Sequence, residues 1–419
     1  MEITGGALFW MLIKRKVRLG CVNCKSRPGV ELSTTWTRVL WLSRLIRIHI
    51  LNMFLGILIV AGLGCCMFEA ASGAEAWRQA QAGYRFEFPR DHKSHPEFKI
   101  EWWYYTGNLR TSNARHFGFQ LTFFRVGVQA RSKNPSRWVV RDLFMTHLAL
   151  SDIKEGRFHF AERLNRAGPG WAGASTDIYR VWNGQWEARL QETGRHALRA
   201  RDRSFGIELD LDPGRPIVLH GTKGISQKGA QKGNTTHYYS LPRMPTQGSV
   251  WLGDQRFEVS GLSWMDHEFG TSFLEPKQKG WDWFAIQLED GLDLMLFQLR
   301  RSDGQLDPHS SGTLIEASGK LRFLRWTDFS LQPIETWHSP HSGATYPVVW
   351  SVSIPSELLN LKIRATLLDQ ELRTERSTSV TYWEGAVEIS GSRGSRPVVG
   401  RGYLEMTGYS GEPMSEFLR

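Results

Sequence analysis

Two carboxylates and a histidine follow a tryptophan in residues 263–268, which read Ser-Trp-Met-Asp-His-Glu. Successive side chains of an extended strand alternate between its two faces. Trp264, Asp266 and Glu268 therefore share one face, and His267 lies on the other. An apolar wall raises the pKa of a carboxyl group, and a second nearby carboxylate raises that pKa further. The pattern predicts an acid that stays protonated near neutral pH, with Asp266, His267 and Glu268 as candidate catalytic residues.

The same residues also have a purely structural interpretation. Asp266 and Glu268 would then lie at a solvated strand end and pair with nearby lysines. Three histidines from separate predicted strands, His147, His237 and His267, lack the close spacing that is typical of a zinc site, so no metal is expected. The chain also has no Gly-x-Ser-x-Gly elbow for nucleophilic hydrolysis. Its glycine-rich loop at residues 221–234 does not open a helix, as a phosphate cradle would.

Aromatic residues gather a second time at residues 101–105, which read Glu-Trp-Trp-Tyr-Tyr. On a strand, Glu101 and Trp103 share one face and Trp102 lies on the other. A charged residue among four aromatic ones acts as a buried acid or caps a rim, and large aromatic residues belong more often to a core than to a site. Glu101, Trp102 and Trp103 are therefore candidate ligand-binding residues with an alternative role in packing.

Composition favours a large all-β protein. The 419 residues exceed one ordinary domain, so two domains are expected. Aromatic residues make up 12% of the chain and glycine occurs 41 times, which together with short alternating runs indicates sandwiches or barrels. The formal net charge is +10, but the arginines form no basic stripe, so no nucleic-acid partner is expected. The four cysteines all precede residue 67, so the folded body needs no disulfide.

Short strands are predicted from about residue 84 onward, and no long 3.6-residue period follows residue 85, so few helices are expected. Asn183-Gly184 and Glu289-Asp290-Gly291 are typical hairpin turns. We place a domain boundary between Phe269 and Gly280. The prediction is an N-terminal domain at residues 85–272 and a C-terminal domain at residues 273–412, each a barrel or curled sheet.

The first 74 residues read as a targeting region. Residues 1–49 are basic and without sustained periodicity, and are expected to be disordered. Residues 50–68 are almost wholly apolar and follow several arginines, so residues 50–74 are predicted to contain a cleaved signal peptide, a lipoprotein signal in which Cys65 carries the lipid, or an uncleaved membrane anchor. All three alternatives place the body outside the cytoplasm, exported and in two cases attached to a membrane.

Several motifs in sequence order resemble one known family. They are Glu101-Trp102-Trp103-Tyr104, Thr146-His147-Leu148, the run from His237 to Arg243 (HYYSLPR), Trp264-Met265-Asp266-His267-Glu268, Gly280-Trp281-Asp282-Trp283, Tyr382-Trp383-Glu384-Gly385 and the run from Gly402 to Tyr409 (GYLEMTGY). This set resembles the AttH / hydroxyneurosporene synthase family, which includes carotenoid 1,2-hydratases. The resemblance runs from about residue 90 to residue 410.

The resemblance implies two lipocalin-like β-barrels that meet at an aromatic cleft, with no cofactor. It implies a catalytic acid at Asp266, beside Trp264, and a hydrophobic terpenoid or lipid as ligand. The expected ligand-binding residues are Glu101, Trp102, Trp103, His147, Tyr238, Tyr239, Trp264, Trp281 and Trp283. The sequence Trp-Met-Asp-His-Glu at residues 264–268 resembles a branch of exported proteins in this family more than the branch that acts on carotenoid pigments. A carotenoid substrate therefore does not follow from the resemblance.

Three functions remain open from the sequence. The first is hydration of a carbon–carbon double bond by acid catalysis from Asp266. The second is a lipocalin-type carrier in which the same aromatic residues only bind lipid. The third is a secreted hydrolase that uses Asp266, His267 and Glu268 on an ester or amide.

Overall fold

The computed structural model describes residues 77–130, 134–231, 233–272 and 274–411. The predicted basic extension, the predicted signal or anchor segment and all four cysteines lie outside the described residues. In the part of the chain that is described, no helix has both the length and the apolar character needed to cross a membrane. Residues Gly73–Arg419 form one compact unit.

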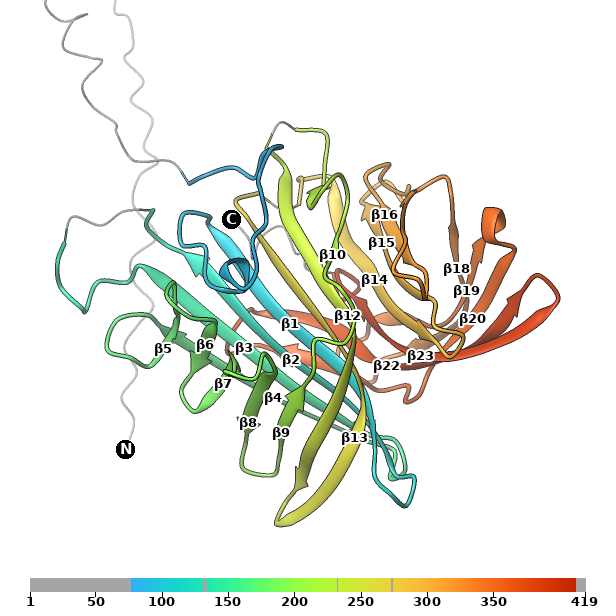
Figure 1. Ribbon diagram of the computed structural model, residues 1–419, viewed down its shortest axis with the longest axis horizontal. Helices are drawn as coiled ribbons and strands as arrows, with labels where there is room; N and C mark the ends of the chain where they lie inside the picture. The colour runs from blue at the N-terminus through green and yellow to red at the C-terminus, as the bar shows by residue number, and fades with distance from the viewer. Residues whose placement is uncertain (1–76, 131–133, 232, 273, 412–419) are drawn as a thin grey trace, which may run out of the picture. The chain divides into compact units, whose positions relative to one another are not determined.

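The first half of this unit is a sheet of 13 antiparallel strands, drawn from blue to yellow in Figure 1. The central order is β4-β3-β2-β1-β13-β12-β9-β8-β7-β6-β5, and β10 and β11 also pair with β12. The strands are β1 (Ile100–Arg110), β2 (His116–Gly127), β3 (Asp142–Asp152), β4 (Arg157–Arg166), β5 (Ala172–Ala174), β6 (Arg180–Asn183), β7 (Trp186–Leu190), β8 (His196–Arg201), β9 (Phe205–Leu211), β10 (Val218–Leu219), β11 (Ile225–Gln227), β12 (Thr235–Leu252) and β13 (Gln255–Gly270).

The second half is a sheet of 10 antiparallel strands, drawn from amber to red (Figure 1). Its order is β17-β16-β15-β14-β23-β22-β20-β19-β18, and β21 pairs with β22. The strands are β14 (Gln278–Leu288), β15 (Asp293–Arg301), β16 (Ser311–Ile315), β17 (Leu321–Arg325), β18 (Ser330–His338), β19 (Thr345–Ile354), β20 (Leu359–Ala365), β21 (Glu371–Thr374), β22 (Val380–Arg393) and β23 (Arg396–Met406).

The all-β class is confirmed. The only helical elements among the described residues are two short 3-10 turns, η1 (Arg90–His92) and η2 (Pro355–Glu357). The predicted Asn183-Gly184 turn joins β6 to β7, and Gly184 has a φ of 64° that favours glycine. The first sheet runs from β1 to β13 and the second begins at β14, so the chain passes from one to the other between Gly270 and Gln278.

Each sheet curls around its own apolar core, as a barrel-like sheet does. The first core includes Trp103, Tyr239 and Met265, and the second includes Trp350 and Trp383. The two ends of the first sheet approach each other through side chains. Asn165 of β4 donates a hydrogen bond to the side-chain oxygen of Asn183 of β6 at 2.6 Å.

A third apolar cluster lies between the two sheets and joins them. It contains Tyr104, Trp264 and Trp283 from both sides of the interface. Strands β1 and β2 of the first sheet contact β23 and β22 of the second. The Asn108 amide crosses the interface and donates to the Gly402 carbonyl at 3.1 Å. The site described below lies in this interface and outside both barrel cores.

A close approach between the two sheets depends on the absence of a side chain at Gly118. A Cβ atom added there would lie 2.6 Å from the Cβ of Ala386 on β22. We expect Gly118→Ala to lower the free energy of unfolding by about 1–3 kcal/mol, because overpacking pushes apart two sheets that cannot yield independently. Chemical denaturation of the purified protein measures this change.

The matched control removes the opposing methyl group, which belongs to Ala386 on β22 of the second sheet. In the double variant Gly118→Ala/Ala386→Gly, the methyl group moves from one sheet to the other, and we expect much of the lost stability to return. A double variant no more stable than Gly118→Ala alone would contradict this account of the interface.

Candidate active site

A pocket with a volume of about 90 Å³ lies between the two sheets. This space suits a small ligand or one end of a larger one. Its aromatic wall consists of Trp102, Tyr104, Phe124, Tyr238, Trp281, Trp283, Phe297 and Tyr382. Four carboxyl groups also line it, from Asp266, Glu268, Glu384 and Glu405. An apolar pocket with a few convergent polar groups is the usual form of a small-molecule site.

Strand β13 supplies two of these carboxyl groups because of its alternation. Asp266 and Glu268 face the pocket, whereas Met265 packs into the core of the first barrel. Asp266 lies opposite Tyr104 on β1 and opposite Ser240 on β12. The central position of β13 between two long strands therefore surrounds its carboxyl groups with neighbours from both sides.

Asp266 is buried and bonded to neutral donors. The Tyr238 hydroxyl donates to Asp266 Oδ2 at 2.5 Å, and the indole N–H of Trp264 donates to Oδ1 at 2.6 Å. The Ser240 hydroxyl also donates to Oδ1. Burial raises the pKa of Asp266 to about 7, although these hydrogen bonds oppose the rise. Asp266 can therefore carry a proton near neutral pH.

Glu268 has a different environment because a lysine reaches it. Lys228 Nζ lies 2.8 Å from Glu268 Oε1, and both side chains are at most 5% exposed. The Thr236 hydroxyl donates to the same carboxylate. Lys228 comes from the glycine- and lysine-rich loop that precedes β12, and its ammonium also lies 4.5 Å from the centre of the Phe297 ring. Glu268 is thus the counter-ion of a buried cation.

The second sheet contributes a pair of carboxyl groups. Glu384 on β22 lies directly opposite Glu405 on β23. Burial and the repulsion from Glu405 raise the pKa of Glu384 well above its ordinary value. Burial, together with the charges of Asp266 and Glu268, raises the pKa of Glu405 to about 7, against a hydrogen bond from the Trp281 indole at 3.0 Å. Glu384 therefore favours the protonated form, and Glu405 is divided between its protonated and ionised forms near neutral pH.

His147 lies at the edge of the pocket in a chain of hydrogen bonds. Its Nδ1 lies 2.7 Å from the Tyr382 hydroxyl, and its Nε2 lies 2.9 Å from the Ser377 hydroxyl. The Ser377 hydroxyl in turn donates to Glu162 at 2.5 Å. Burial lowers the pKa of His147 to about 3, so the imidazole is neutral and positions Tyr382.

The comparisons with known proteins identify the family. The AttH-like family model matches residues 79–409. A solved structure of an AttH protein from Nitrosomonas europaea shares 34% sequence identity and has a TM-score of 0.73, over 79% of this chain and 99% of that one. The chain belongs to the AttH-like family. The resemblance drawn from the motifs is thereby confirmed, as is the lipocalin-like fold that it implied.

Two further relatives of this AttH-like chain carry names of reactions. The structure of kievitone hydratase from Nectria haematococca is 18% identical and has a TM-score of 0.62, over 80% of this chain and 96% of that one, which shows a shared fold. Dehydratase asqC from Emericella nidulans is 23% identical over 201 residues, which cover 46% of this chain. The match spans 50% of that relative, so the AttH-like chain covers about half of its length.

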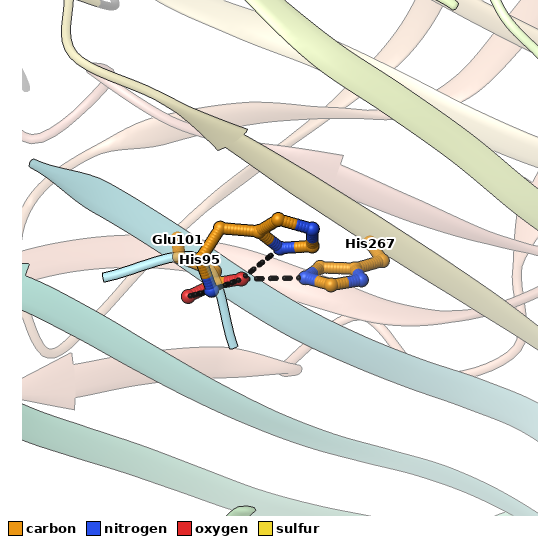
Figure 2. Close-up of side chains that lie close together, drawn as sticks. All are labelled: His95, Glu101 and His267. Atoms are coloured by element: carbon orange, nitrogen blue, oxygen red, sulfur yellow. Dashed lines mark hydrogen bonds and ion pairs between the residues drawn. The ribbon is translucent and has the colours of Figure 1, made fainter. Parts of the chain in front are cut away.

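The opposite face of β13 in this AttH-like protein holds a separate polar cluster (Figure 2). His267 Nε2 and His95 Nδ1 both contact Glu101 Oε1, at 3.0 Å and 2.8 Å. Arg125 Nε donates to Glu101 Oε2 at 3.1 Å. Burial raises the pKa of Glu101. The hydrogen bonds from His267 and His95 and the charge of Arg125 outweigh burial and hold this pKa well below its ordinary value. The cluster is a buried ion-pair network inside the first barrel.

His95, Glu101 and His267 are also the one group among the described residues whose ligand atoms lie close enough for a metal ion, within 4.8 Å of one another. Their donors are already engaged. Asp91 accepts from His95 Nε2 at 3.4 Å, and the Tyr239 hydroxyl lies 2.9 Å from His267 Nδ1. A divalent cation would add to the positive charge of Arg125, which is 1% exposed, so the arrangement suits a protein-only network better than a metal centre.

The predicted site residues divide between these two faces. Those that line the pocket are Asp266, Glu268, Trp102, His147, Tyr238, Trp281 and Trp283, and Trp264 lies directly behind Asp266. Those that lie away from the pocket, inside the first barrel, are His267, Glu101, Trp103 and Tyr239. The reason is the strand period of two, which sends neighbours in sequence to opposite faces.

Several pocket residues were not among the predicted site residues. They are Tyr104, Lys228, Tyr382, Glu384 and Glu405. Glu384 and Glu405 lie within two of the motifs that carry the family resemblance, so a charged residue inside such a motif was an available signal. Lys228 lies in a loop whose sequence has no feature that predicts a buried ammonium group.

Glu101 should be essential for stability, since it is the carboxylate partner of the buried Arg125 guanidinium. We expect Glu101→Gln to lower the free energy of unfolding by about 3–5 kcal/mol, because it removes one partner of a buried pair. The control is Glu97→Gln, at the exposed pair with Arg78, where we expect a change of about 0–1 kcal/mol. Equal effects of the two substitutions in urea denaturation would contradict this assignment.

Asp266 should also make stability depend on pH. Its pKa of about 7 lies above the ordinary value of 3.8, so the folded state binds more protons than the unfolded state between these pH values. The contribution of Asp266 is therefore fully present below about pH 4 and is lost as the pH rises toward 7. We expect the slope of unfolding free energy against pH to differ between the wild type and Asp266→Asn by about 1.4 kcal/mol per pH unit in this window. Identical slopes would show that Asp266 is ionised throughout.

Proposed function

We propose that this AttH-like protein adds water to a carbon–carbon double bond of a hydrophobic small molecule, or removes water to form one, with Asp266 as the acid. The observation that carries the proposal is the Asp266 carboxyl group, buried in an aromatic pocket, bonded to neutral donors and holding its proton up to about pH 7. General acids in enzymes are tuned toward the working pH in this way.

The reaction needs an acid, a stabilised intermediate and a base. In the hydration direction, the proton of Asp266 bonds to one alkene carbon, and the π electron pair forms the new C–H bond. The cation left on the other carbon faces the indole rings of Trp102 and Trp283, whose π systems stabilise positive charge. A water oxygen then bonds to this carbon and its surplus proton passes to a carboxylate. Dehydration follows the same steps in reverse.

Glu405 is the best placed proton acceptor for the attacking water. His267 faces the other side of β13, and Glu268 is held as the counter-ion of Lys228. The pKa of Glu405, about 7, leaves a fraction of this group ionised at neutral pH. Asp266 and Glu405 both line the pocket and come from different sheets, so the acid and the base reach the ligand from different sheets.

The relatives support the same reaction type. One is a kievitone hydratase and the other a dehydratase, so their names describe the addition and the removal of water. We extend this to the present chain as part of the proposal. We also infer export, with or without attachment to a membrane, from the basic and apolar residues 1–74, and a terpenoid or other lipid as the ligand class.

A turnover assay tests the role of Asp266. The purified protein is incubated with terpenoid alkenes and the corresponding alcohols in water enriched in heavy oxygen, and mass spectrometry detects label gained or lost. We expect Asp266→Asn to lower turnover by about 10²-fold or more and to keep ligand binding, because the amide keeps the shape but cannot donate the proton. Asp303→Asn, at an exposed turn outside the pocket, is the matched control and should keep full activity.

The outcomes separate the alternatives. An Asp266→Asn variant as active as the wild type would rule out acid catalysis by this residue. Ligand that binds and returns unchanged from every incubation would favour a lipid carrier. Release of an alcohol or an acid from an ester or amide would favour a hydrolase.

A further inference from the structure

Two buried oxygen atoms that line the pocket have no hydrogen-bond partner among the described residues. The Tyr104 hydroxyl and Glu384 Oε1 are each solvent-inaccessible and make no hydrogen bond within the described residues. Their residues are 7% and 1% exposed, and both line the pocket. Buried polar groups without partners are rare in folded proteins, and each one requires an explanation. A ligand atom that fills this place would provide one.

The two groups converge from different sheets. Tyr104 lies on β1, opposite Asp266, and Glu384 lies on β22, opposite Glu405. They lie close to each other: after burial, the proximity of Glu384 raises the pKa of Tyr104, although no hydrogen bond of normal length and angle joins the two side chains. The T-shaped contact between Tyr104 and Trp283, with ring centroids 5.1 Å apart, fixes the direction of the phenol.

Both groups are neutral hydrogen-bond donors. Burial and the neighbouring Glu405 raise the pKa of Glu384 well above its ordinary value, so its carboxyl group favours the protonated form. The Tyr104 phenol is likewise protonated. A phenol and a protonated carboxylic acid that lie close together in one pocket are suited to an oxygen atom that gains negative charge during a reaction, such as a carbonyl oxygen.

We propose that Tyr104 and Glu384 form a subsite for a carbonyl oxygen, so that the ligand is a hydrophobic α,β-unsaturated ketone or the matching β-hydroxy ketone. This inference rests on the proposed function and narrows its substrate class. A pure hydrocarbon would leave both donors desolvated and unpaired, whereas a carbonyl group accepts from both. Its two lone pairs match the two donors.

With this substrate class the addition of water passes through an enolate, which replaces the cation described above for an alkene without a carbonyl group. The water oxygen bonds to the β-carbon of the enone, and the carbon–carbon π pair shifts so that negative charge collects on the carbonyl oxygen, where Tyr104 and Glu384 stabilise it. The resulting enolate takes the proton of Asp266 at its α-carbon. The proton lost by the water passes to the Glu405 carboxylate, and proton exchange with solvent restores both carboxyl groups. No oxidant or reductant is required.

Two dyes of similar shape test the subsite directly. The first is para-dimethylaminochalcone, an enone whose absorption moves to longer wavelength when its carbonyl oxygen accepts hydrogen bonds. The second is para-dimethylaminostilbene, which lacks the carbonyl group. Both are titrated against the wild type, Tyr104→Phe, Glu384→Leu and Glu384→Gln, and against Asp266→Asn as a variant that keeps the subsite. Thermal unfolding confirms that each variant is folded.

We expect the wild type to bind the chalcone more tightly than the stilbene and to shift its absorption to longer wavelength. Tyr104→Phe and Glu384→Leu should each weaken chalcone binding about tenfold and reduce the shift, and should bind the stilbene as tightly as the wild type or more tightly. Glu384→Gln keeps an N–H donor and should recover part of the shift. Asp266→Asn should keep chalcone binding whether or not it keeps turnover, so failure of the acid role and failure of the subsite give different results.

The subsite is overturned if the wild type does not prefer the chalcone, or if Tyr104→Phe weakens the binding of both dyes equally. Should Glu384→Leu not fold, the comparison between the wild type and Tyr104→Phe decides alone, because this substitution removes a single oxygen atom.

Discussion

The structure depends on the exclusion of water from carboxyl groups between two packed sheets. Asp266, Glu384 and Glu405 lie in the interface, and burial is the largest cause of the raised pKa of each. A charge in such a place is unstable unless a cation accompanies it. Among the described residues that line the pocket, Lys228 supplies an ammonium group, and Glu268 binds it. The remaining acids are left with neutral partners, and this gives the pocket its acidic chemistry.

Two carboxyl groups on neighbouring strands show that the surroundings of such a group decide its pKa. Glu101 on β1 and Asp266 on β13 are both fully enclosed. Glu101 faces the first barrel, where Arg125 and two histidines hold its pKa well below the ordinary value. Asp266 faces the interface, where it meets hydroxyl and indole donors and its pKa rises. One residue is a structural counter-ion and the other a candidate acid, although their chemical groups are the same.

The double-barrel architecture separates stability from chemistry. Each sheet encloses a core of its own, and the third cluster lies between them. Residues in this third cluster can change without loss of either core, which is a reason why one fold can serve different reactions. Within the AttH-like family, the reaction is therefore best inferred from the side chains of the interface. In this chain they are four carboxyl groups, one lysine and an aromatic wall.

Much of the fold was predictable because it depends on local patterns. The short strands predicted from about residue 84 onward are present, and the Asn183-Gly184 turn was found where glycine permits it. The alternation of side chains along a strand placed Asp266 and Glu268 on one face and His267 on the other, in agreement with the structure. Alternation could not reveal that the face of β13 that carries His267 points into the interior of the first barrel.

The sequence by itself determined the all-β class, the family and the acidic motif at Asp266, since strand period, turn chemistry and motif order are properties of neighbouring residues. Only the tertiary structure decided which faces meet. In β22, Glu384 and Glu388 lie on the same face of the strand, so the sequence predicts equal exposure to solvent for both. The first sheet covers Glu384, however, and leaves Glu388 exposed. Burial by a distant segment, with Lys228 delivered from another loop, sets the protonation of the pocket, and such contacts between residues far apart in the chain leave no local pattern to read.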